Sequence, residues 1–267
     1  MRDPYAQNRA NWEARVDLHR ESSFYDLPGF LAGTSGRLPQ QDVDEVGAVA
    51  GKSLLHLQCH LGLDSISWAF RGALVTGVDF SPKAIATARK LAAELGLDTR
   101  FICADVYDLP SDLDTDFQVI YSTRGVLCWL GDLSAWAMTV ARHLAPEGLF
   151  YLADDHPVLD LLGEAEPGLD WHGRYFHDPE PVRCENPGSY TGPDPRFPEP
   201  VSYQWHHDLG EIVTALAQAG LVIEFLREWP WAYYRARPWM VEGPDGTWRV
   251  PGGNLPLSFS LRAHHGP

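Results

Sequence analysis

The sequence predicts an α/β fold: a Rossmann-like, doubly wound sheet of seven mostly parallel strands, with an N-terminal cap and an insertion after the fifth strand. Short apolar runs alternate with helical patterns over residues 51–154, which is typical of βαβ units around a parallel sheet. Residues 157–200 interrupt this alternation, since nine of these 44 positions are proline. A helical pattern and two further apolar runs follow between residues 208 and 263 and supply the last two strands.

The first five strands and their helices follow from these patterns in chain order. We expect strands at residues 53–58, 74–79, 99–104, 117–122 and 148–154. Between them we expect helices at 63–71, at 82–95 and at 132–143. Gly72 and Gly96 end the first two helices. Ser81 and Pro82 begin the second, because serine caps a helix and proline fits its first turn.

The remaining segments are expected to complete one domain of 267 residues around the core at 50–154. Residues 1–46 form a polar N-terminal cap whose helix, near 8–18, has poor amphipathic periodicity. Residues 157–205 form an insertion that acts as a substrate lid; disorder is the alternative, and its many aromatic residues argue against it. Residues 206–267 close the sheet, with a helix at 208–220 capped by Asp208 and strands at 221–226 and 257–263.

Composition excludes several classes of function. The formal net charge is −15, and the basic residues are scattered among acids, so a nucleic-acid partner is not expected. The four cysteines, at positions 59, 103, 128 and 184, form no Cys-x-x-Cys pair and fit a reduced intracellular protein. From the polar N-terminal residues and the lack of a long apolar run we expect neither a signal peptide nor a membrane-spanning segment. We therefore expect a cytoplasmic monomer or homodimer without a membrane partner.

Two aspartates follow neighbouring strands at the edge where such folds bind nucleotides. The segment 54–65 has the strand–turn–helix pattern that brings a helix N-terminus to a ligand. Asp79 stands 21 residues after Gln58 (79 − 58) and ends the next strand, where a carboxylate accepts hydrogen bonds from ribose hydroxyls. Asp105 follows the third strand and can pair with an adenine amino group. Tyr121 and Ser122 end the fourth strand below the reacting centre.

Five motifs in order resemble those of the class I S-adenosylmethionine-dependent methyltransferases. They are His56-Leu57-Gln58-Cys59-His60-Leu61-Gly62, Gly77-Val78-Asp79-Phe80-Ser81, Cys103-Ala104-Asp105-Val106, Val119-Ile120-Tyr121-Ser122 and Leu144-Ala145-Pro146-Glu147-Gly148. The resemblance covers residues 50–154 well and 208–263 moderately. It implies S-adenosylmethionine as the cofactor and methyl transfer to a small-molecule substrate.

The first motif departs from the family pattern Asp-Leu-Gly-Cys-Gly-x-Gly. His56 replaces the aspartate, Gln58 and His60 replace the first two glycines, and Gly62 remains. Because residues other than glycine resist a positive φ, we expect a shifted cofactor whose amino-acid end contacts Gln58 and His60. The residues predicted to bind the cofactor are Tyr5, Trp12, Gln58, Cys59, His60, Gly62, Asp64, Asp79, Phe80, Asp105, Val106 and Ser122.

Removing a proton from a hydroxyl, amine or acidic carbon requires a base, and histidine titrates near neutral pH. His156 follows the fifth strand, His206 and His207 precede the last helix, and His19 lies in the N-terminal segment. One of these four is predicted to be the general base, with His156 and His206 favoured. The alternative is a structural hydrogen-bonding role for each. No metal is expected, since neither His-x-x-x-His nor His-Glu-x-x-His occurs.

Aromatic residues gather in the second half of the chain. Trp171, Trp205, Trp229, Trp231, Trp239 and Trp248 all follow residue 154, and Tyr203, Tyr233 and Tyr234 accompany them. We expect them to build an apolar pocket for a small organic ligand; covering a thin core or a dimer contact is the alternative. The predicted substrate-binding residues are Tyr121, Trp205, His207, Trp231 and Tyr234. Candidates to bind a substrate carboxylate or phosphate are Arg183, Arg196, Arg235 and Arg237.

Three other functions stay open beside methyl transfer. A cofactor-binding enzyme of the same fold can catalyse a different reaction, such as a cyclisation. A non-catalytic protein can bind S-adenosylmethionine as a sensor. A nicotinamide-dependent oxidoreductase is disfavoured because its Gly-x-Gly-x-x-Gly fingerprint is absent.

Overall fold

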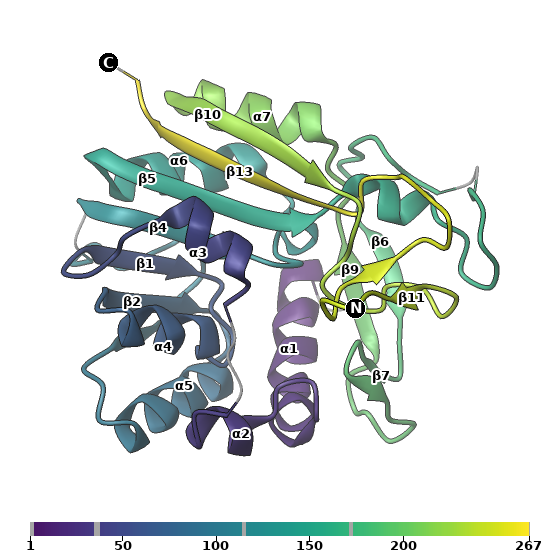
Figure 1. Ribbon diagram of the computed structural model, residues 1–267, viewed down its shortest axis with the longest axis horizontal. Coiled ribbons are helices and arrows are strands. Elements are labelled where there is room, and N and C mark those ends of the chain that lie inside the picture. Colours follow the sequence, from purple (N-terminus) through teal and green to yellow (C-terminus); the bar gives the residue numbers. More distant parts are fainter. Residues whose placement is uncertain (1–2, 35–37, 114–115, 171–172, 267) are drawn as a thin grey trace.

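A computed structural model describes residues 3–34, 38–113, 116–170 and 173–266. Its centre is a seven-stranded sheet in the order β10-β13-β5-β4-β1-β2-β3 (Figure 1). The strands are β1 (Ser53–Leu57), β2 (Leu74–Asp79), β3 (Arg100–Cys103), β4 (Phe117–Thr123), β5 (Leu144–Asp155), β10 (Leu221–Trp229) and β13 (Ser258–His265). β13 runs antiparallel to both of its neighbours, β5 and β10, and the other six strands run in one direction. The predicted doubly wound, mostly parallel sheet is confirmed.

Helices cover both faces of the sheet (Figure 1). On one face lie α3 (Gln40–Val46), α4 (Leu63–Phe70) and α5 (Pro82–Glu94), and on the other lie α6 (Leu133–His143) and α7 (Leu209–Gln218). The predicted caps Ser81 and Asp208 form, and Asp132 caps α6 in the same way, since each accepts a hydrogen bond from the backbone N–H three residues ahead. Such caps are worth about 1 kcal/mol each.

The N-terminal helix α1 (Pro4–Glu21) is longer than predicted, and its buried face is polar. The buried side chains are Asn8, Asn11, Arg15, Val16 and His19. Asn8 Nδ2 donates to the Tyr203 carbonyl at 2.7 Å, and the Tyr203 N–H donates back to Asn8 Oδ1 at 2.7 Å. The weak amphipathic periodicity follows from this, because the helix faces polar backbone and a cavity instead of an apolar core.

The insertion after β5 is ordered over its described part. It contains η2 (Pro157–Leu161) and two hairpins, β6 (Val182–Glu185) with β9 (Val201–Gln204) and β7 (Gly188–Ser189) with β8 (Gly192–Pro193). Of these strands, β9 and β7 pack against α1. A further hairpin, β11 (Val241–Glu242) with β12 (Trp248–Arg249), lies on the same side of the view as the insertion (Figure 1). Trp171 lies outside the described residues.

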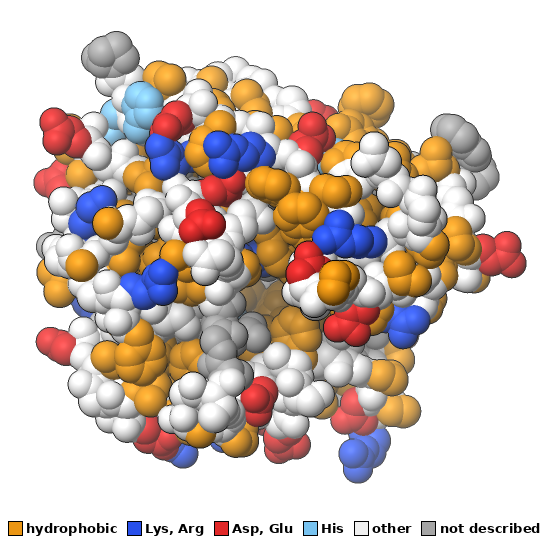
Figure 2. All heavy atoms as spheres, in the orientation of Figure 1, with side chains coloured by type: hydrophobic (Ala, Val, Ile, Leu, Met, Phe, Trp, Pro, Cys, Tyr) orange, Lys and Arg blue, Asp and Glu red, His pale blue; other side chains and the backbone are white. Residues whose placement is uncertain are grey.

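Two short helices complete the elements. They are α2 (Leu27–Leu31), which follows α1, and the 3-10 turn η1 (Leu127–Trp129), which follows β4. On the face in Figure 2, the basic side chains are scattered among acidic ones, as the sequence indicates. Within the described ranges, every helix is too short or too polar to cross a bilayer.

Candidate functional site

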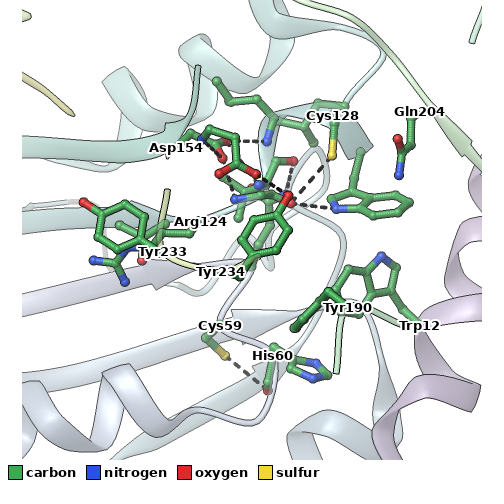
Figure 3. Close-up of a pocket in the computed structure, with 18 of the residues that line it drawn as sticks. Trp12, Cys59, His60, Arg124, Cys128, Asp154, Tyr190, Gln204, Tyr233 and Tyr234 are labelled. Carbon is green, nitrogen blue, oxygen red and sulfur yellow. Dashed lines mark hydrogen bonds between the residues drawn. The ribbon is translucent and has the colours of Figure 1, made fainter. Parts of the chain in front are cut away.

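A cavity of about 770 Å³ opens at the carboxyl ends of β1, β2, β4 and β5. Strand order reverses there between β1 and β4, which is where doubly wound folds bind their ligands. Residues of α1 and of the insertion form the opposite wall, with Trp12 and Tyr190 facing the loop after β1 (Figure 3). These segments and the sheet edge therefore enclose a volume that fits a small ligand.

The loop after β1 keeps the backbone of a glycine-rich turn although two of its three glycines are replaced. Gln58, His60 and Gly62 all have positive φ, at 56°, 48° and 75°. For Gln58 and His60 this conformation costs roughly 1–2 kcal/mol each. The Cys59 N–H donates to the Val78 carbonyl at 2.9 Å and so ties the loop to β2. The prediction that Gln58 and His60 resist a positive φ is therefore wrong, because contacts around the loop impose this conformation.

Replacing Gly62 by alanine is expected to lower the free energy of unfolding by about 2–4 kcal/mol, the sum of overpacking and a left-handed backbone. A Cβ there would lie 2.8 Å from both Ala88 Cβ and the Phe101 ring. Gly96→Ala is the matched control, since its φ is +67° and nothing lies within 4 Å. It should cost only about 1 kcal/mol. Urea unfolding measures both, and equal losses would contradict the packing argument.

Asp79 and Asp105 line the same cavity. The Asp79 carboxylate accepts the N–H groups of His60 and Ser81, both at 2.9 Å, and burial raises its pKa to about 6. Asp105 is exposed and accepts the Tyr107 N–H at 3.0 Å. An ionised carboxylate accepts about four hydrogen bonds, so both groups keep capacity for a ligand.

Beside this loop, the cavity offers an acceptor without a partner. Gln58 Nε2 donates to the Val126 carbonyl at 3.1 Å, while Gln58 Oε1 is buried and has no hydrogen-bond partner. His60 Nε2 lies 2.7 Å from Nδ1 of His19, and the Trp12 ring packs edge-on against His60 at 5.2 Å (Figure 3). The unpaired amide oxygen fits a cationic donor such as an α-ammonium group.

The predicted bases are mostly held in structural hydrogen bonds. His156 Nδ1 accepts the Val158 N–H at 3.1 Å and its Nε2 lies 2.8 Å from Glu228, while burial lowers its pKa. His206 pairs with Asp160 at 2.9 Å. These two line the cavity. Since both ring nitrogens of His156 are engaged, it is poorly placed to take a proton from a ligand.

His207 and His19 are held in the same way. His207 lines the cavity and lies 2.8 Å from Glu211 and 2.6 Å from the Leu130 carbonyl. His19 lies outside the cavity lining, between His60 and Ser189, and burial lowers its pKa to about 2.

Asp155 is the titratable group that the sequence analysis missed. Its Oδ2 accepts the Tyr234 hydroxyl at 3.0 Å, and its Oδ1 is buried without a hydrogen-bond partner. Burial, together with the neighbouring Asp154, raises its pKa to about 7. Asp154 itself accepts the N–H groups of Val126, Leu127 and Asp155 at 2.8–3.1 Å, which fixes the end of β5 (Figure 3). In the sequence, two adjacent aspartates directly before His156 could have indicated this titratable group.

The other predicted residues divide between the cavity and the protein interior. Those that line the cavity are Tyr5, Trp12, Gln58, Cys59, His60, Gly62, Asp64, Asp79, Phe80, Asp105, Val106, Trp205, His207 and Tyr234. Tyr121 is fully buried and donates to Asp42 on the opposite face of the sheet. Ser122 is also fully buried, and Trp231 packs against Trp229 at 4.8 Å. These three are not among the lining residues.

One group among the described residues has metal-ligating side chains close together. The ligand atoms of His177, His207 and Glu211 lie within 4.8 Å of one another. The two imidazole rings are stacked, with centroids 5.2 Å apart and an angle of 11° between them. Stacked rings direct their nitrogens in parallel and not toward a common point, so we assign no metal to this group.

Comparison with known proteins identifies one family. A model described as a methyltransferase domain matches residues 54–148. A ubiquinone biosynthesis O-methyltransferase of Caulobacter vibrioides is 30% identical over 168 residues, which cover 58% of this chain and 66% of that protein. An enzyme of the same name from Caulobacter sp. is 35% identical over 157 residues, or 59% of this chain and 57% of that one. The chain thus spans less than two thirds of these relatives.

A solved structure supports the fold over a longer span. The S-adenosylmethionine dependent methyltransferase from Mesorhizobium loti matches with a TM-score of 0.56 at 21% identity, covering 84% of this chain and 95% of that one. At this identity the likeness concerns the fold.

Proposed function

The chain belongs to the class I S-adenosylmethionine-dependent methyltransferases, and we propose that it methylates a small molecule held in the cavity described above. One observation carries this proposal: Asp79 and Asp105 line the same cavity as a turn that keeps positive φ although two of its glycines are replaced. In this arrangement, Asp79 would accept the ribose hydroxyls and Asp105 the adenine amino group. Gln58 Oε1, which has no protein partner, would accept the α-ammonium group.

The cofactor supplies an electrophilic methyl group on a sulfonium. The residues of the chain then have three tasks, which are to align the acceptor, to exclude water and to take a proton. Asp155 is placed for the last task, because its Oδ1 is free and its pKa is about 7. On methylation the acceptor would gain the methyl group, and Asp155 would take the proton that the acceptor releases.

We propose an oxygen acceptor on a small aromatic or otherwise apolar molecule. The relatives are named as O-methyltransferases, and a hydroxyl is an acceptor that requires a base. Aromatic side chains on several sides of the cavity suit such a ligand; they include Trp12, Trp129, Trp205, Tyr233 and Tyr234. The formal net charge of −15 makes a nucleic-acid acceptor unfavourable.

Two measurements test this function. Calorimetric titration should show binding of S-adenosylmethionine and S-adenosylhomocysteine but not of NAD. Incubation with methyl-labelled S-adenosylmethionine and a panel of phenols should transfer the label and release S-adenosylhomocysteine. Binding without turnover on any acceptor would favour a sensor, and S-adenosylhomocysteine without a methylated product would favour another reaction. Binding of NAD alone would overturn the assignment.

A further inference from the structure

Arg15 places a buried positive charge on the wall of the cavity without a counter-ion. It lies on α1, its side chain is among those that line the cavity, and it is only 5% exposed. Its guanidinium carbon lies 5.1 Å from the centre of the Trp12 ring and 5.7 Å from that of Trp129. The two indoles hold the guanidinium in place but carry no negative charge that would neutralise it.

The ionisable groups around Arg15 do not balance its charge. The groups whose charges act on it most strongly are the hydroxyls and thiols of Tyr25, Cys128, Cys184 and Tyr190, and none of these is a carboxylate. Arg15 Nε is buried without a hydrogen-bond acceptor, and no carboxylate of the described residues forms an ion pair with it. Burial lowers the pKa of Arg15, yet a guanidinium keeps its proton at neutral pH. An unpaired buried cation is strongly unfavourable, so it indicates a missing anion.

The other cations that line the cavity are already engaged. Arg124 pairs with Asp42 and lies 3.6 Å from Asp64. Arg237 donates to the carbonyls of Leu159, Leu162 and Ala236. Arg235 donates to the Pro238 carbonyl. Among the described lining residues, Arg15 is therefore the buried arginine that has no carboxylate partner, whereas Arg235 is exposed to solvent.

We propose that Arg15 is the anion-binding residue of this cavity and that it holds a carboxylate of the bound ligand. This inference rests on the proposed function. The carboxylate belongs either to the methionyl end of the cofactor or to the acceptor molecule. A guanidinium is suited to both, because its planar donors match the two oxygens of a carboxylate.

The test compares Arg15→Met with the wild-type chain by calorimetry against three probes. S-adenosylhomocysteine carries the methionyl carboxylate, 5′-methylthioadenosine lacks it, and benzoate is a simple aromatic carboxylate. A loss of about 10- to 100-fold for S-adenosylhomocysteine with unchanged methylthioadenosine affinity assigns Arg15 to the cofactor. A similar loss confined to benzoate assigns it to the acceptor. Unchanged affinities for all three, or parallel losses including methylthioadenosine, overturn the proposal.

Two controls separate binding from folding. Arg20→Met alters an exposed arginine of the same helix and should change none of the three affinities. The ligand-free Arg15→Met variant should melt a few degrees above the wild-type chain, because it removes an unpaired buried charge. A lower melting temperature would indicate a structural role for Arg15 instead. If the wild-type chain itself binds neither adenosyl probe, the proposed function fails, and this outcome differs from a failure of the Arg15 assignment.

Discussion

Replacing Asp155 by asparagine is expected to lower the kcat for methyl transfer by about 10²- to 10⁴-fold, the usual contribution of a general base. The amide keeps the size of the side chain and its hydrogen bond with the Tyr234 hydroxyl, but it cannot take a proton. Affinity for S-adenosylhomocysteine should stay within about twofold, because Asp155 does not touch the proposed adenosine contacts. The assay follows labelled product from the acceptor that the phenol panel identifies. Full turnover in this variant would exclude Asp155 as the base.

The pH profile gives a second measure of the same group. Asp155 must be ionised to accept a proton, and burial raises its pKa to about 7. The kcat of the wild-type chain should therefore rise with pH, reach its midpoint near pH 7 and level off above it. The residual kcat of Asp155→Asn should not show this rise with pH. A rising limb that persists in the variant would indicate a different base, and His206 would then be the next residue to replace.

The same pKa shift has a consequence for stability, with a defined sign. The folded chain holds the Asp155 proton up to about pH 7, whereas the unfolded chain releases it near 3.8. The folded state therefore binds more protons across this window, and its stability falls as pH rises through it. Asp155→Asn removes this loss, so the ligand-free variant should melt above the wild-type chain at pH 8. At pH 4 the two melting temperatures should nearly coincide.

Most of the sheet could be predicted because its signals are local. The strands of the core are rich in apolar residues, and Ser81, Asp132 and Asp208 cap the helices that the patterns predict. Helix α1 was predicted too short, because its buried face carries Asn8, Asn11 and other polar groups whose partners lie almost 200 residues away. A hydrophobic period cannot reveal a face that binds polar backbone.

The site could be predicted only where chain order fixes the geometry. Asp79 and Asp105 were found because parallel strands end at a common edge. Tyr121 was expected in the site but points to the far face, where Asp42 binds its hydroxyl. Asp155 and Arg15 differ from many other charged residues in having a buried polar atom without a hydrogen-bond partner, and that property depends on the folded chain. The arginines proposed from sequence form ion pairs or donate to carbonyls instead.

Replacing Asp79 by alanine is expected to weaken S-adenosylhomocysteine binding by about 100-fold or more, since hydrogen bonds to a charged group are worth about 1.5–3 kcal/mol each. The side chain also accepts the N–H groups of His60 and Ser81, so the loss alone would not separate ligand contact from loop support. Adenosine and 2′,3′-dideoxyadenosine make that separation, because they differ only in the two ribose hydroxyls.

The wild-type chain should prefer adenosine over its dideoxy analogue, and Asp79→Ala should bind both equally weakly. Burial raises the pKa of Asp79 to about 6, and the protonated carboxyl loses acceptor capacity. The preference of the wild-type chain should therefore decline as pH falls below about 6, while the variant shows no such dependence. If Asp79→Ala still prefers adenosine, another group must bind the ribose hydroxyls, because the variant lacks the carboxylate to which this preference is assigned.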